Sequence, residues 1–453
     1  MLNMRISTIA FTCQGQMHGA DETINNIVID SRAVEAGDLF VALQGEHSDG
    51  HDYLEAALAK GALAAIVERP MDVAISQIIV SDAVKAMADI ASAKRDEFQG
   101  TVIAITGSSG KTSTRTMLSQ ILAKAGTVSA TQGNFNNDLG LPLTIFKADS
   151  QADYWALEMG AAQGGDITRL MHIAKPNVSV ITNVGNAHIG RFGSVEKIAQ
   201  AKAEIYCDLD SDAIAVINLD DAFATKWQSD FTGKQLTYSV NQSQADVYAS
   251  AIELQANSSA FILHYQGQSQ PVSLALAGQH NIQNAVCAAS CALAAGISLE
   301  HIAQGLLDMQ PVAGRMQFKD RLDGVTIIDD SYNANPGSVK AAIDVLAMQT
   351  GRRILVLGDM AELGEEASAY HADVGRYAKA KAIDCLLSCG TESQHASAAF
   401  AANAQHFNEQ TALIDYLSRT AKAGDVVLIK GSRSSAMDVV VEQLEQKAAT
   451  SCC

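Results

Sequence analysis

Positive charge is scarce in this sequence. Its 453 residues include 32 Lys and Arg against 50 Asp and Glu, which gives a formal net charge of −18. An acidic protein repels a phosphate backbone unless Lys and Arg gather locally, and the sequence contains no basic cluster. We therefore expect no nucleic-acid partner. If the substrate is itself anionic, metal ions and a few fixed cations must neutralise it.

Long apolar runs are missing as well. The longest, AVCAASCALAAGI from Ala285, is shorter than the roughly 20 residues that span a bilayer and is interrupted by Ser. It predicts a buried helix. The N-terminal stretch is broken early by Ser7, Thr8 and Thr12, which makes it a poor core for a signal peptide. We expect a cytoplasmic protein without membrane insertion and, since no oligomerisation element stands out, a monomer.

C-x-x-C pairs of cysteines are also absent. The eight cysteines are scattered, and none has the C-x-x-C spacing that is typical of zinc and redox sites. Cys287 and Cys291 lie one helical turn apart in the Ala-rich segment, where buried core thiols are expected.

Short β-rich runs alternate with helical patterns along the whole chain. This alternation predicts an α/β protein with largely parallel sheets. The clearest strands are DLFVAL from Asp38, TVIAIT from Thr101, YWALEM from Tyr154, VSVITN from Val178, AIAVIN from Ala213, VTIIDD from Val325, RILVLG from Arg353 and DVVLIK from Asp425. Several of them run into Gly-rich or polar turns, and ligands of open α/β sheets collect at such carboxyl ends.

Two segments are candidate domain boundaries. The polar KRDEFQG precedes the strand at Thr101, and DMQPVAGRMQ around Pro311 separates a helical region from another strand-first unit. We predict an N-terminal domain over residues 1–99, a central domain over 100–313 and a C-terminal domain over 314–453.

The segment TGSSGKTS lies between a predicted strand and a helical pattern. Gly107 and Gly110 let backbone amides face an anion, Lys111 adds a point charge, and Thr112 and Ser113 offer hydroxyls to Mg²⁺. The alternative is an ordinary Gly-containing turn before a helix. The longer form of the motif would have Gly where this chain has Ile105, so the pattern predicts a phosphate loop of the shorter G-x-x-G-K-T form.

A lysine falls within an apolar helical stripe. The segment SVEKIAQAKAEIYCDL from Ser194 places Lys202 between Ile198 and Ile205 at helical spacing. Burial of a charged amine is costly and lowers its pKa. Two interpretations stay open: the side chain extends to solvent, or a neutral amine reacts with CO₂ to give a carbamate that ligates a metal.

Candidate metal ligands follow two predicted strands. Glu158 ends YWALEM, and Asn183 and His188 follow VSVI in the segment TNVGNAHIG. Hard oxygen ligands suit Mg²⁺, which usually takes one or two protein ligands together with phosphate oxygens. A single loop His is more often an ordinary hydrogen-bonding residue, so the position of His188 counts for more than its identity.

Together these motifs resemble the ATP-dependent Mur ligases of peptidoglycan synthesis, a family that also includes folylpolyglutamate synthetase. The resemblance covers essentially the whole chain and adds GQHNIQNAVCA from Gly278 and GRMQ from Gly314. It implies the α/β, three-domain Mur ligase architecture, with a central P-loop-type parallel sheet and a Rossmann-like C-terminal domain.

The resemblance also assigns roles to residues. The implied cofactor is ATP with two Mg²⁺ ions, and carbamylation of Lys202 is implied as well. The implied catalytic residues are Lys111, Lys202, His188 and Arg315. The implied metal ligands are Thr112, Glu158, His188 and Lys202. The implied nucleotide-binding residues are Gly107, Ser108, Ser109, Gly110, Lys111, Thr112, Ser113, His280, Asn281, Asn284, Arg315 and Asp330.

Less general segments point to one branch of the family. DDSYNANPGSV from Asp329, LGDMAELGEEASAYH from Leu357 and LIKGSRSSAMDVVV from Leu428 resemble the member that adds D-alanyl-D-alanine to UDP-N-acetylmuramoyl-tripeptide, the final cytoplasmic step of precursor synthesis. The D-N-P-R motif expected of the diaminopimelate-adding member is absent. The implied substrate-binding residues are Ser31, Arg32, Asn134, Asn136, Asn137, Tyr332, Asn333 and Asn335.

Several of these positions have simpler interpretations. Ser31 and Arg32, the Asn-rich segment and the turn at Asp330 can each be a hydrogen-bonded turn. For the whole chain, the alternatives are a related amide ligase such as folylpolyglutamate synthetase, or a non-catalytic ATP-binding module. The resemblance implies an acyl-phosphate mechanism in which a substrate carboxylate attacks the γ-phosphate of ATP and an amine then displaces phosphate.

Overall fold

The computed structural model describes residues 3–321 and 323–451. By compactness the chain forms two units. The first contains residues 1–106, 125–180 and 204–215, and the second contains residues 107–124, 181–203 and 216–453. These units do not follow the predicted boundaries at 99/100 and 313/314, which stay predictions. No helix within the described part of the chain is long and apolar enough to cross a membrane.

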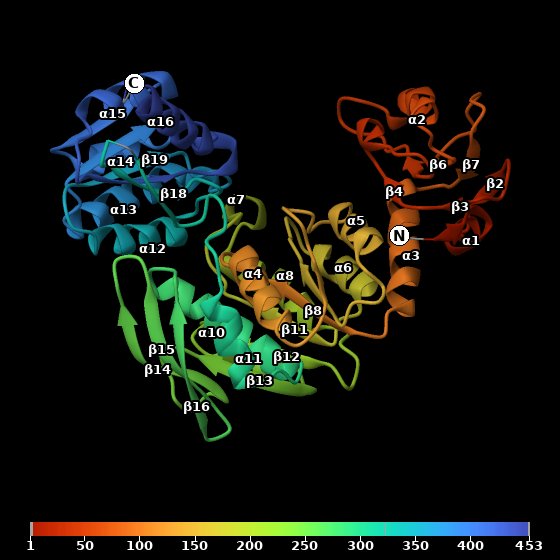
Figure 1. Cartoon of the computed structure of the whole chain (residues 1–453), viewed down its shortest axis with the longest axis horizontal. Coiled ribbons are helices and arrows are strands. Elements are labelled where there is room, and N and C mark those ends of the chain that lie inside the picture. Colours follow the sequence, from red (N-terminus) through yellow and green to blue (C-terminus); the bar gives the residue numbers. More distant parts are fainter. Residues whose placement is uncertain (1–2, 322, 452–453) are drawn as a thin grey trace. The chain divides into compact units, whose positions relative to one another are not determined.

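The first unit opens with a small mixed sheet (Figure 1). Its strands follow the order β2 (Gln16–His18), β7 (Ser76–Ile79), β6 (Ala64–Val67), β5 (Leu39–Val41) and β4 (Ile27–Val28). All neighbours are parallel except β2 and β7. Helix α2 (Leu54–Ala59) covers one face, with Leu54 and Ala57 buried against Phe40 and Val67. Also present are β1 (Met4–Arg5), β3 (Thr23–Ile24), α1 (Ile6–Thr12), η1 (Ser31–Ala33) and η2 (Gly50–Tyr53).

The rest of the first unit is a parallel α/β layer. Strand β10 (Tyr154–Glu158) pairs in parallel with β8 (Thr101–Thr106) on one side and β9 (Val128–Ala130) on the other. The helices are α3 (Ala83–Glu97), α5 (Gly140–Lys147) and α6 (Asp166–Ala174), with η3 (Glu204–Tyr206). Helix α3 packs on α5 and α6. Strands β11 (Val178–Ile181) and β12 (Ile214–Asn218) each contain residues of both units.

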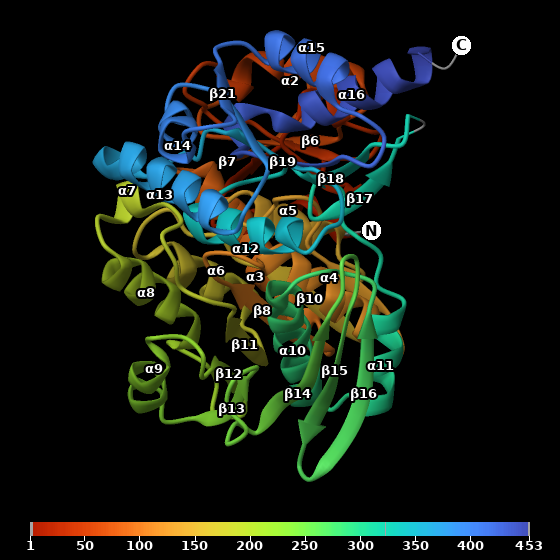
Figure 2. The same ribbon diagram turned by 90° about the vertical axis from the view of Figure 1, so that its left-hand side faces the viewer.

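The second unit begins with the helix that follows the phosphate-loop segment. Helix α4 (Lys111–Leu122) packs on α10 (Gln279–Ala294) and α11 (Leu299–Leu307). Strands β13 (Lys234–Ser239), β14 (Val247–Leu254), β15 (Ser259–Tyr265) and β16 (Gln268–Leu274) extend beside these helices (Figure 2). The remaining helices of this part are α7 (Ile189–Phe192), α8 (Val195–Ala203) and α9 (Ala224–Asp230).

The C-terminal part of the second unit is a doubly covered sheet. Its order is β17 (Gln317–Asp320), β18 (Thr326–Asp330), β22 (Val426–Lys430), β19 (Arg353–Gly358), β20 (Cys385–Cys389) and β21 (Ala404–Phe407), and only β17 is antiparallel. Side chains alternate between two cores: α12 (Pro336–Ala347), α13 (Ala367–Ala380) and α14 (Gln394–Phe400) cover one face, and α15 (Gln410–Thr420) and α16 (Met437–Ser451) the other (Figure 1).

The parallel sheets and the Rossmann-like C-terminal part confirm the predicted fold class. Every strand predicted above is present with its ends within two residues, and the Ala-rich run from Ala285 lies in the buried helix α10. The helix predicted from Ser194 is shorter than expected, because α8 ends at Ala203 and the chain continues as the 3₁₀ turn η3. The antiparallel strands β14 to β16 have no counterpart in the prediction.

Candidate active site

The segment between β8 and α4 has the backbone of an anion-binding loop. Gly107 and Gly110 adopt left-handed φ values of 151° and 81°. A Cβ on Gly107 would lie 1.8 Å from Thr182 Oγ1, and one on Gly110 would lie 2.2 Å from Asn284 Oδ1, so only Gly fits at either position. The Lys111 ammonium group donates to the Gly107 carbonyl at 2.8 Å, across the loop. This geometry agrees with the predicted phosphate loop.

The end of β11 holds the loop in place. Thr182 Oγ1 donates to the Ser109 carbonyl at 2.6 Å, and Asn183 Nδ2 donates to the same carbonyl at 3.1 Å. Asn183 Oδ1 accepts from the Ser109 amide at 3.1 Å, and the Ser108 amide donates to the Asn183 carbonyl at 2.9 Å. Asn183 therefore supports the loop with both ends of its amide group. The supporting role of Thr182 was not predicted, although its place directly after a buried strand is a usable signal.

The Lys202 side chain is buried in α8, with 2% of the residue exposed. Its amine forms no hydrogen bond or ion pair with any residue that the structure describes. Burial lowers the pKa of this amine well below its usual range, and the positive charge of Lys111 acts in the same direction. The interpretation in which Lys202 extends to solvent is therefore wrong, and a neutral, buried amine is the state that reacts with CO₂.

His188 lies in the same electrostatic neighbourhood. Its Nδ1 contacts the Glu362 carboxylate. Burial lowers the pKa of His188, the Glu362 charge opposes this shift, and the charges of Lys111 and Lys202 add to it. Three groups that can carry positive charge thus gather around the phosphate loop of the second unit, where an anion would offset their mutual repulsion.

The predicted ligand Glu158 belongs to the first unit. It is 3% exposed, and its Oε1 accepts from Asn136 Nδ2 at 2.9 Å. Within residues 3–321 and 323–451, no three His, Cys, Asp or Glu side chains are arranged to hold a metal ion by themselves. Mg²⁺ at a nucleotide needs only one or two protein ligands besides phosphate and water. Glu158 in the first unit and Thr112 in the second each offer the kind of oxygen donor that Mg²⁺ prefers, and the buried Lys202 amine would offer another once carbamylated.

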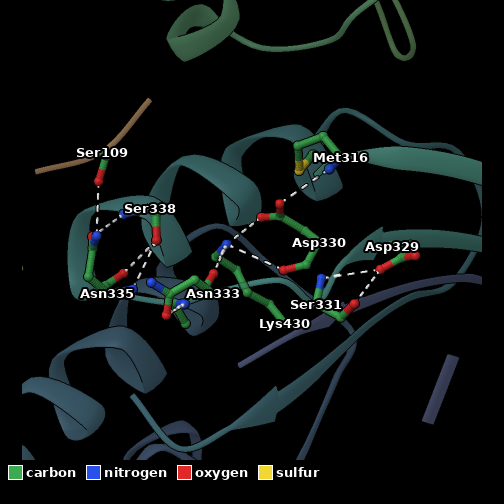
Figure 3. A network of polar contacts seen from close by, with 10 residues as sticks. Ser109, Met316, Asp329, Asp330, Ser331, Asn333, Asn335, Ser338 and Lys430 are labelled. Atoms are coloured by element: carbon green, nitrogen blue, oxygen red, sulfur yellow. Dashed lines mark hydrogen bonds and ion pairs between the residues drawn. The ribbon is translucent and has the colours of Figure 1, made fainter. Parts of the chain in front are cut away.

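Two residues of the C-terminal part reach the phosphate loop. Arg315 donates through one guanidinium nitrogen to Thr112 Oγ1 at 3.0 Å, and its guanidinium carbon lies 4.4 Å from the centroid of the Tyr332 ring. Asn335 Nδ2 donates to Ser109 Oγ at 2.9 Å (Figure 3). The predicted residues Arg315 and Asn335 thus contact the loop, and the Tyr332 ring forms a cation–π contact with the Arg315 guanidinium group.

Asp330 is held within the fold. Its Oδ2 accepts from Lys430 Nζ at 2.5 Å, and its Oδ1 accepts from the Met316 amide at 3.2 Å (Figure 3). Lys430 also donates to the Asn333 carbonyl at 2.9 Å, and the Asn333 side chain accepts from the Ala334 amide at 2.9 Å. Lys430 was not predicted, and its place at the end of β22 opposite Asp330 is visible only once the strands are paired.

Three of the predicted nucleotide-binding residues, His280, Asn281 and Asn284, stand at the start of α10. Asn281 Nδ2 donates to the Ala277 carbonyl at 2.8 Å. Asn284 Oδ1 accepts from Thr114 Oγ1 at 3.4 Å and lies beside Gly110, so this residue contacts the loop helix. Burial lowers the pKa of His280, and the Asp330 charge opposes the shift.

The predicted residues of the first unit form local contacts. Arg32 is exposed and pairs with Asp30 at 2.9 Å, within the turn η1 that also contains Ser31. The amide of Gly140 donates to Asn137 Oδ1 at 2.8 Å where α5 begins, and the Asn134 carbonyl accepts from the Asn136 amide at 2.8 Å. The side chains of Arg32 and Asn137 thus stabilise turns, and the substrate roles of all the predicted residues of this unit stay predictions.

Comparison with known proteins agrees with the geometry. Three domain models match this chain: "Mur ligase family, catalytic domain" at residues 23–99, "Mur ligase middle domain" at 105–292 and "Mur ligase, glutamate ligase domain" at 314–433. The UDP-N-acetylmuramoyl-tripeptide–D-alanyl-D-alanine ligase of Escherichia coli (strain K12) is 38% identical over 449 residues, which cover 98% of this chain and 99% of the relative.

Solved structures give the same result. A crystal structure of MurF from Acinetobacter baumannii superposes with a TM-score of 0.93 at 34% identity and covers 98% of this chain and 100% of that chain. MurF ligase from Thermotoga maritima in complex with ADP superposes with a TM-score of 0.86 at 30% identity, covering 94% of this chain and 98% of that chain. This chain therefore belongs to the Mur ligase family, among the UDP-N-acetylmuramoyl-tripeptide–D-alanyl-D-alanine ligases.

Proposed function

We propose that this protein is the ATP-dependent ligase that joins D-alanyl-D-alanine to UDP-N-acetylmuramoyl-tripeptide. The observation that carries the proposal is the phosphate loop with Arg315 and Asn335 on it and with Lys202 and His188 beside it. A nucleotide-sensing module needs the loop alone. A buried amine without a partner among the described residues and a loop-facing guanidinium suit an enzyme that transfers the γ-phosphate.

The reaction has two steps. The terminal carboxylate of the tripeptide attacks the γ-phosphorus of ATP, the bond between that phosphorus and the β,γ-bridging oxygen breaks, and ADP leaves. The free amine of D-alanyl-D-alanine then attacks the acyl carbon, phosphate leaves with the C–O bond electrons, and the amine proton is lost. Each step needs positioning and charge compensation more than a protein nucleophile.

Each group of residues has a proposed part in these steps. The amides of residues 107–113 and the Lys111 ammonium group hold the phosphates. Arg315, fixed by Tyr332 and Thr112, stabilises the charge that develops on the transferred γ-phosphoryl group. His280, Asn281, Asn284 and Asp330 surround the nucleoside.

Mg²⁺ would be held by Thr112, Glu158, His188 and carbamylated Lys202 in two sites. When bound, it neutralises the phosphate and carboxylate charges that an acidic protein otherwise repels. The carbamate would convert Lys202 from a group that repels Lys111 into an anion that attracts it.

The parts of the chain divide the substrates between them in this proposal. Residues 1–99, with Ser31 and Arg32, bind the UDP-sugar, residues 100–313 bind ATP, and residues 314–453 bind the incoming dipeptide. Asn134, Asn136, Asn137, Tyr332, Asn333 and Asn335 contact the peptide substrates. Since both nucleotides are cytoplasmic metabolites, we place the reaction in the cytoplasm.

Phosphate release tests the proposal. The purified protein is given ATP, Mg²⁺, UDP-N-acetylmuramoyl-tripeptide and D-alanyl-D-alanine, and each component is omitted in turn. We expect phosphate release only with the complete set, together with a UDP-pentapeptide product by mass spectrometry. Release that ignores the dipeptide would contradict the proposal. Release stimulated by glutamate and a folate would favour the folylpolyglutamate alternative.

A further inference from the structure

Two loops of the second unit approach each other closely. One contains His188 and the start of α7, and the other follows β19 and contains Glu362. The Gly190 amide donates to the Glu362 carbonyl at 2.9 Å. A Cβ on Gly190 would lie 2.6 Å from the Gly364 nitrogen, which leaves no room for a side chain between the backbones. Both glycines are therefore required for this contact between the loops.

The Glu362 side chain uses both carboxylate oxygens in this contact. Its Oε2 meets His188 Nδ1, and its Oε1 pairs with an Arg191 nitrogen at 2.8 Å. Glu362 and His188 both have left-handed backbones, with φ values of 62° and 60°. Such conformations are unfavourable for a non-Gly residue and cluster at functional sites. Two strained residues thus face each other beside the phosphate loop.

We propose that Glu362 is a positioning residue for His188. A carboxylate in ion-pair contact with Nδ1 favours a proton on that nitrogen, restricts the ring orientation and leaves Nε2 as the lone-pair donor for a metal ion. The proposal rests on the proposed function, in which His188 is a metal ligand. It adds a residue from the C-terminal part of the chain to the support of the metal site.

This arrangement couples the docking of the loop after β19 to the binding of the metal ion. Glu362 can orient His188 only while the loop after β19 lies against α7. The metal ion therefore binds more tightly when this loop is docked and, by reciprocity, a bound metal favours docking. Arg191 pairs only with the other carboxylate oxygen and does not contact the atoms that meet His188.

Mn²⁺ binding in the presence of a non-hydrolysable ATP analogue provides a measurement that is independent of turnover. Free Mn²⁺ is measured by electron paramagnetic resonance for the full-length protein and for Glu362→Ala, Glu362→Gln and Arg191→Met. We expect Glu362→Ala to weaken Mn²⁺ binding by about 10- to 100-fold, as observed for removed outer-shell partners. The Gln amide oxygen still accepts the Nδ1 proton, so Glu362→Gln should lose no more than about threefold.

Arg191→Met is the matched control, because it removes the other ion pair of the same loop contact and leaves Glu362 on His188. We expect its Mn²⁺ affinity to stay within about twofold of the parent. Thermal unfolding of all variants checks that they are folded. The proposal is overturned if Glu362→Ala binds Mn²⁺ as tightly as the parent does, or more tightly. An equal loss in Arg191→Met would also overturn it, because the loop contact as a whole would then explain the effect.

Failure of the proposed function gives a different result. In that case the parent itself forms no UDP-pentapeptide, whatever its Mn²⁺ affinity. A parent that forms the product while Glu362→Ala retains full Mn²⁺ affinity overturns the positioning role alone.

Discussion

Lys111, Lys202 and His188 are three groups that can carry positive charge inside an acidic protein. The net charge of −18 disfavours anionic substrates at long range, and Lys111 supplies a positive charge at the loop, while burial favours the neutral forms of Lys202 and His188. The sequence predicted each of the three residues individually, from the loop motif, the helical stripe and a strand end. Their mutual proximity appears only in the folded second unit.

Lys202→Ala should lower turnover on the order of 100-fold, because it removes the amine that would carry the carbamate ligand. Short carboxylic acids such as acetate should restore part of the rate by entering the space of the lost side chain. Steady-state phosphate release with and without the acids measures both effects. Lys197→Ala, an exposed lysine of the same helix, is the control and should retain full activity. Undiminished turnover in Lys202→Ala would exclude the carbamate role.

Arg315→Lys should separate γ-phosphate recognition from nucleotide binding. Lys cannot form the same planar contact with Tyr332 while donating to Thr112. We expect kcat to fall by about 100-fold. The dissociation constant of ADP, which lacks the γ-phosphate, should change by less than about threefold. Calorimetric titration with ADP and with a non-hydrolysable ATP analogue checks this, and an equal loss of affinity for both would argue for a general nucleotide contact.

At the scale of elements, α3 shows how one helix stabilises two others. Lys94 Nζ donates to the carbonyls of Phe146 and Ala148 at 2.8 Å each, where α5 ends. Arg95 donates to the carbonyls of Ala174 and Lys175 at 2.7 and 2.8 Å, where α6 ends. Carbonyls at a helix C-terminus lack intrahelical partners and carry partial negative charge, so buried cations satisfy both needs.

The stability that depends on Lys94 should vary with pH. Burial lowers the pKa of Lys94 to about 8 from 10.5. Between these values the unfolded chain keeps the proton that the folded chain has lost, so stability rises with pH across this window. From pH 7.5 to pH 10, the free energy of unfolding of the parent should rise relative to that of Lys94→Met by about 2–3 kcal/mol.

The measurement follows urea unfolding through Trp155, which stacks on Phe98 just beyond α3 at 3.9 Å between ring centroids. A Trp227→Phe background makes the fluorescence specific to the first unit. The lost carbonyl contacts of Lys94→Met give a constant offset at every pH. A difference between parent and variant that does not change with pH would contradict the assigned pKa.

The elements also show where local patterns fall short. The antiparallel strands β14 to β16 contain many polar residues, and their hairpin turn at Gln266 and Gly267 uses left-handed φ values of 49° and 76°. A Gln-Gly turn is a weaker signal than Asn-Gly, which explains why the hairpin was not predicted.

The helix from Ser194 ends earlier than its sequence pattern predicts. Glu204 is the first residue of η3, and its carboxylate accepts hydrogen bonds from the amides of Gly165 and Thr168 at 2.7 and 3.0 Å. These contacts lie outside the helix and cannot be read from its local pattern.

At the scale of the whole molecule, the distribution of apolar surface favours a monomer. The large hydrophobic side chains that are exposed among the described residues come from different elements. They are Phe11, Tyr53, Val84, Phe135, Leu254, Leu307 and Val439. Scattered apolar residues are ordinary surface features, so the monomer stays our prediction. Sedimentation equilibrium at micromolar concentration should give a single species of 47.8 kDa. A species of twice that mass, stable to dilution, would show that an interface exists.

The sequence by itself determined the fold class and the family, and it predicted a phosphate loop whose backbone geometry the structure matches. Short-range sequence patterns indicate these features: alternating β-rich and helical runs, glycines at a fixed spacing in the loop motif, and a lysine at helical spacing. The predicted strand ends agree with the observed ones because the hydrogen-bonding pattern and the burial periodicity of a strand are local properties of its sequence. The comparisons confirm the family and fold, while the Mg²⁺ sites, the carbamate and the individual residue roles stay predictions.

Only the tertiary structure decided which distant residues meet. Asn335 reaches Ser109 across 226 residues of sequence, and Arg315 reaches Thr112 across 203. The contact between Glu362 and His188 likewise joins two separate loops. No local pattern encodes these pairs, because each depends on how complete sheets and helices pack. The physical reason is that such packing is a collective result of the whole core, so the partners of an active-site residue follow from the fold.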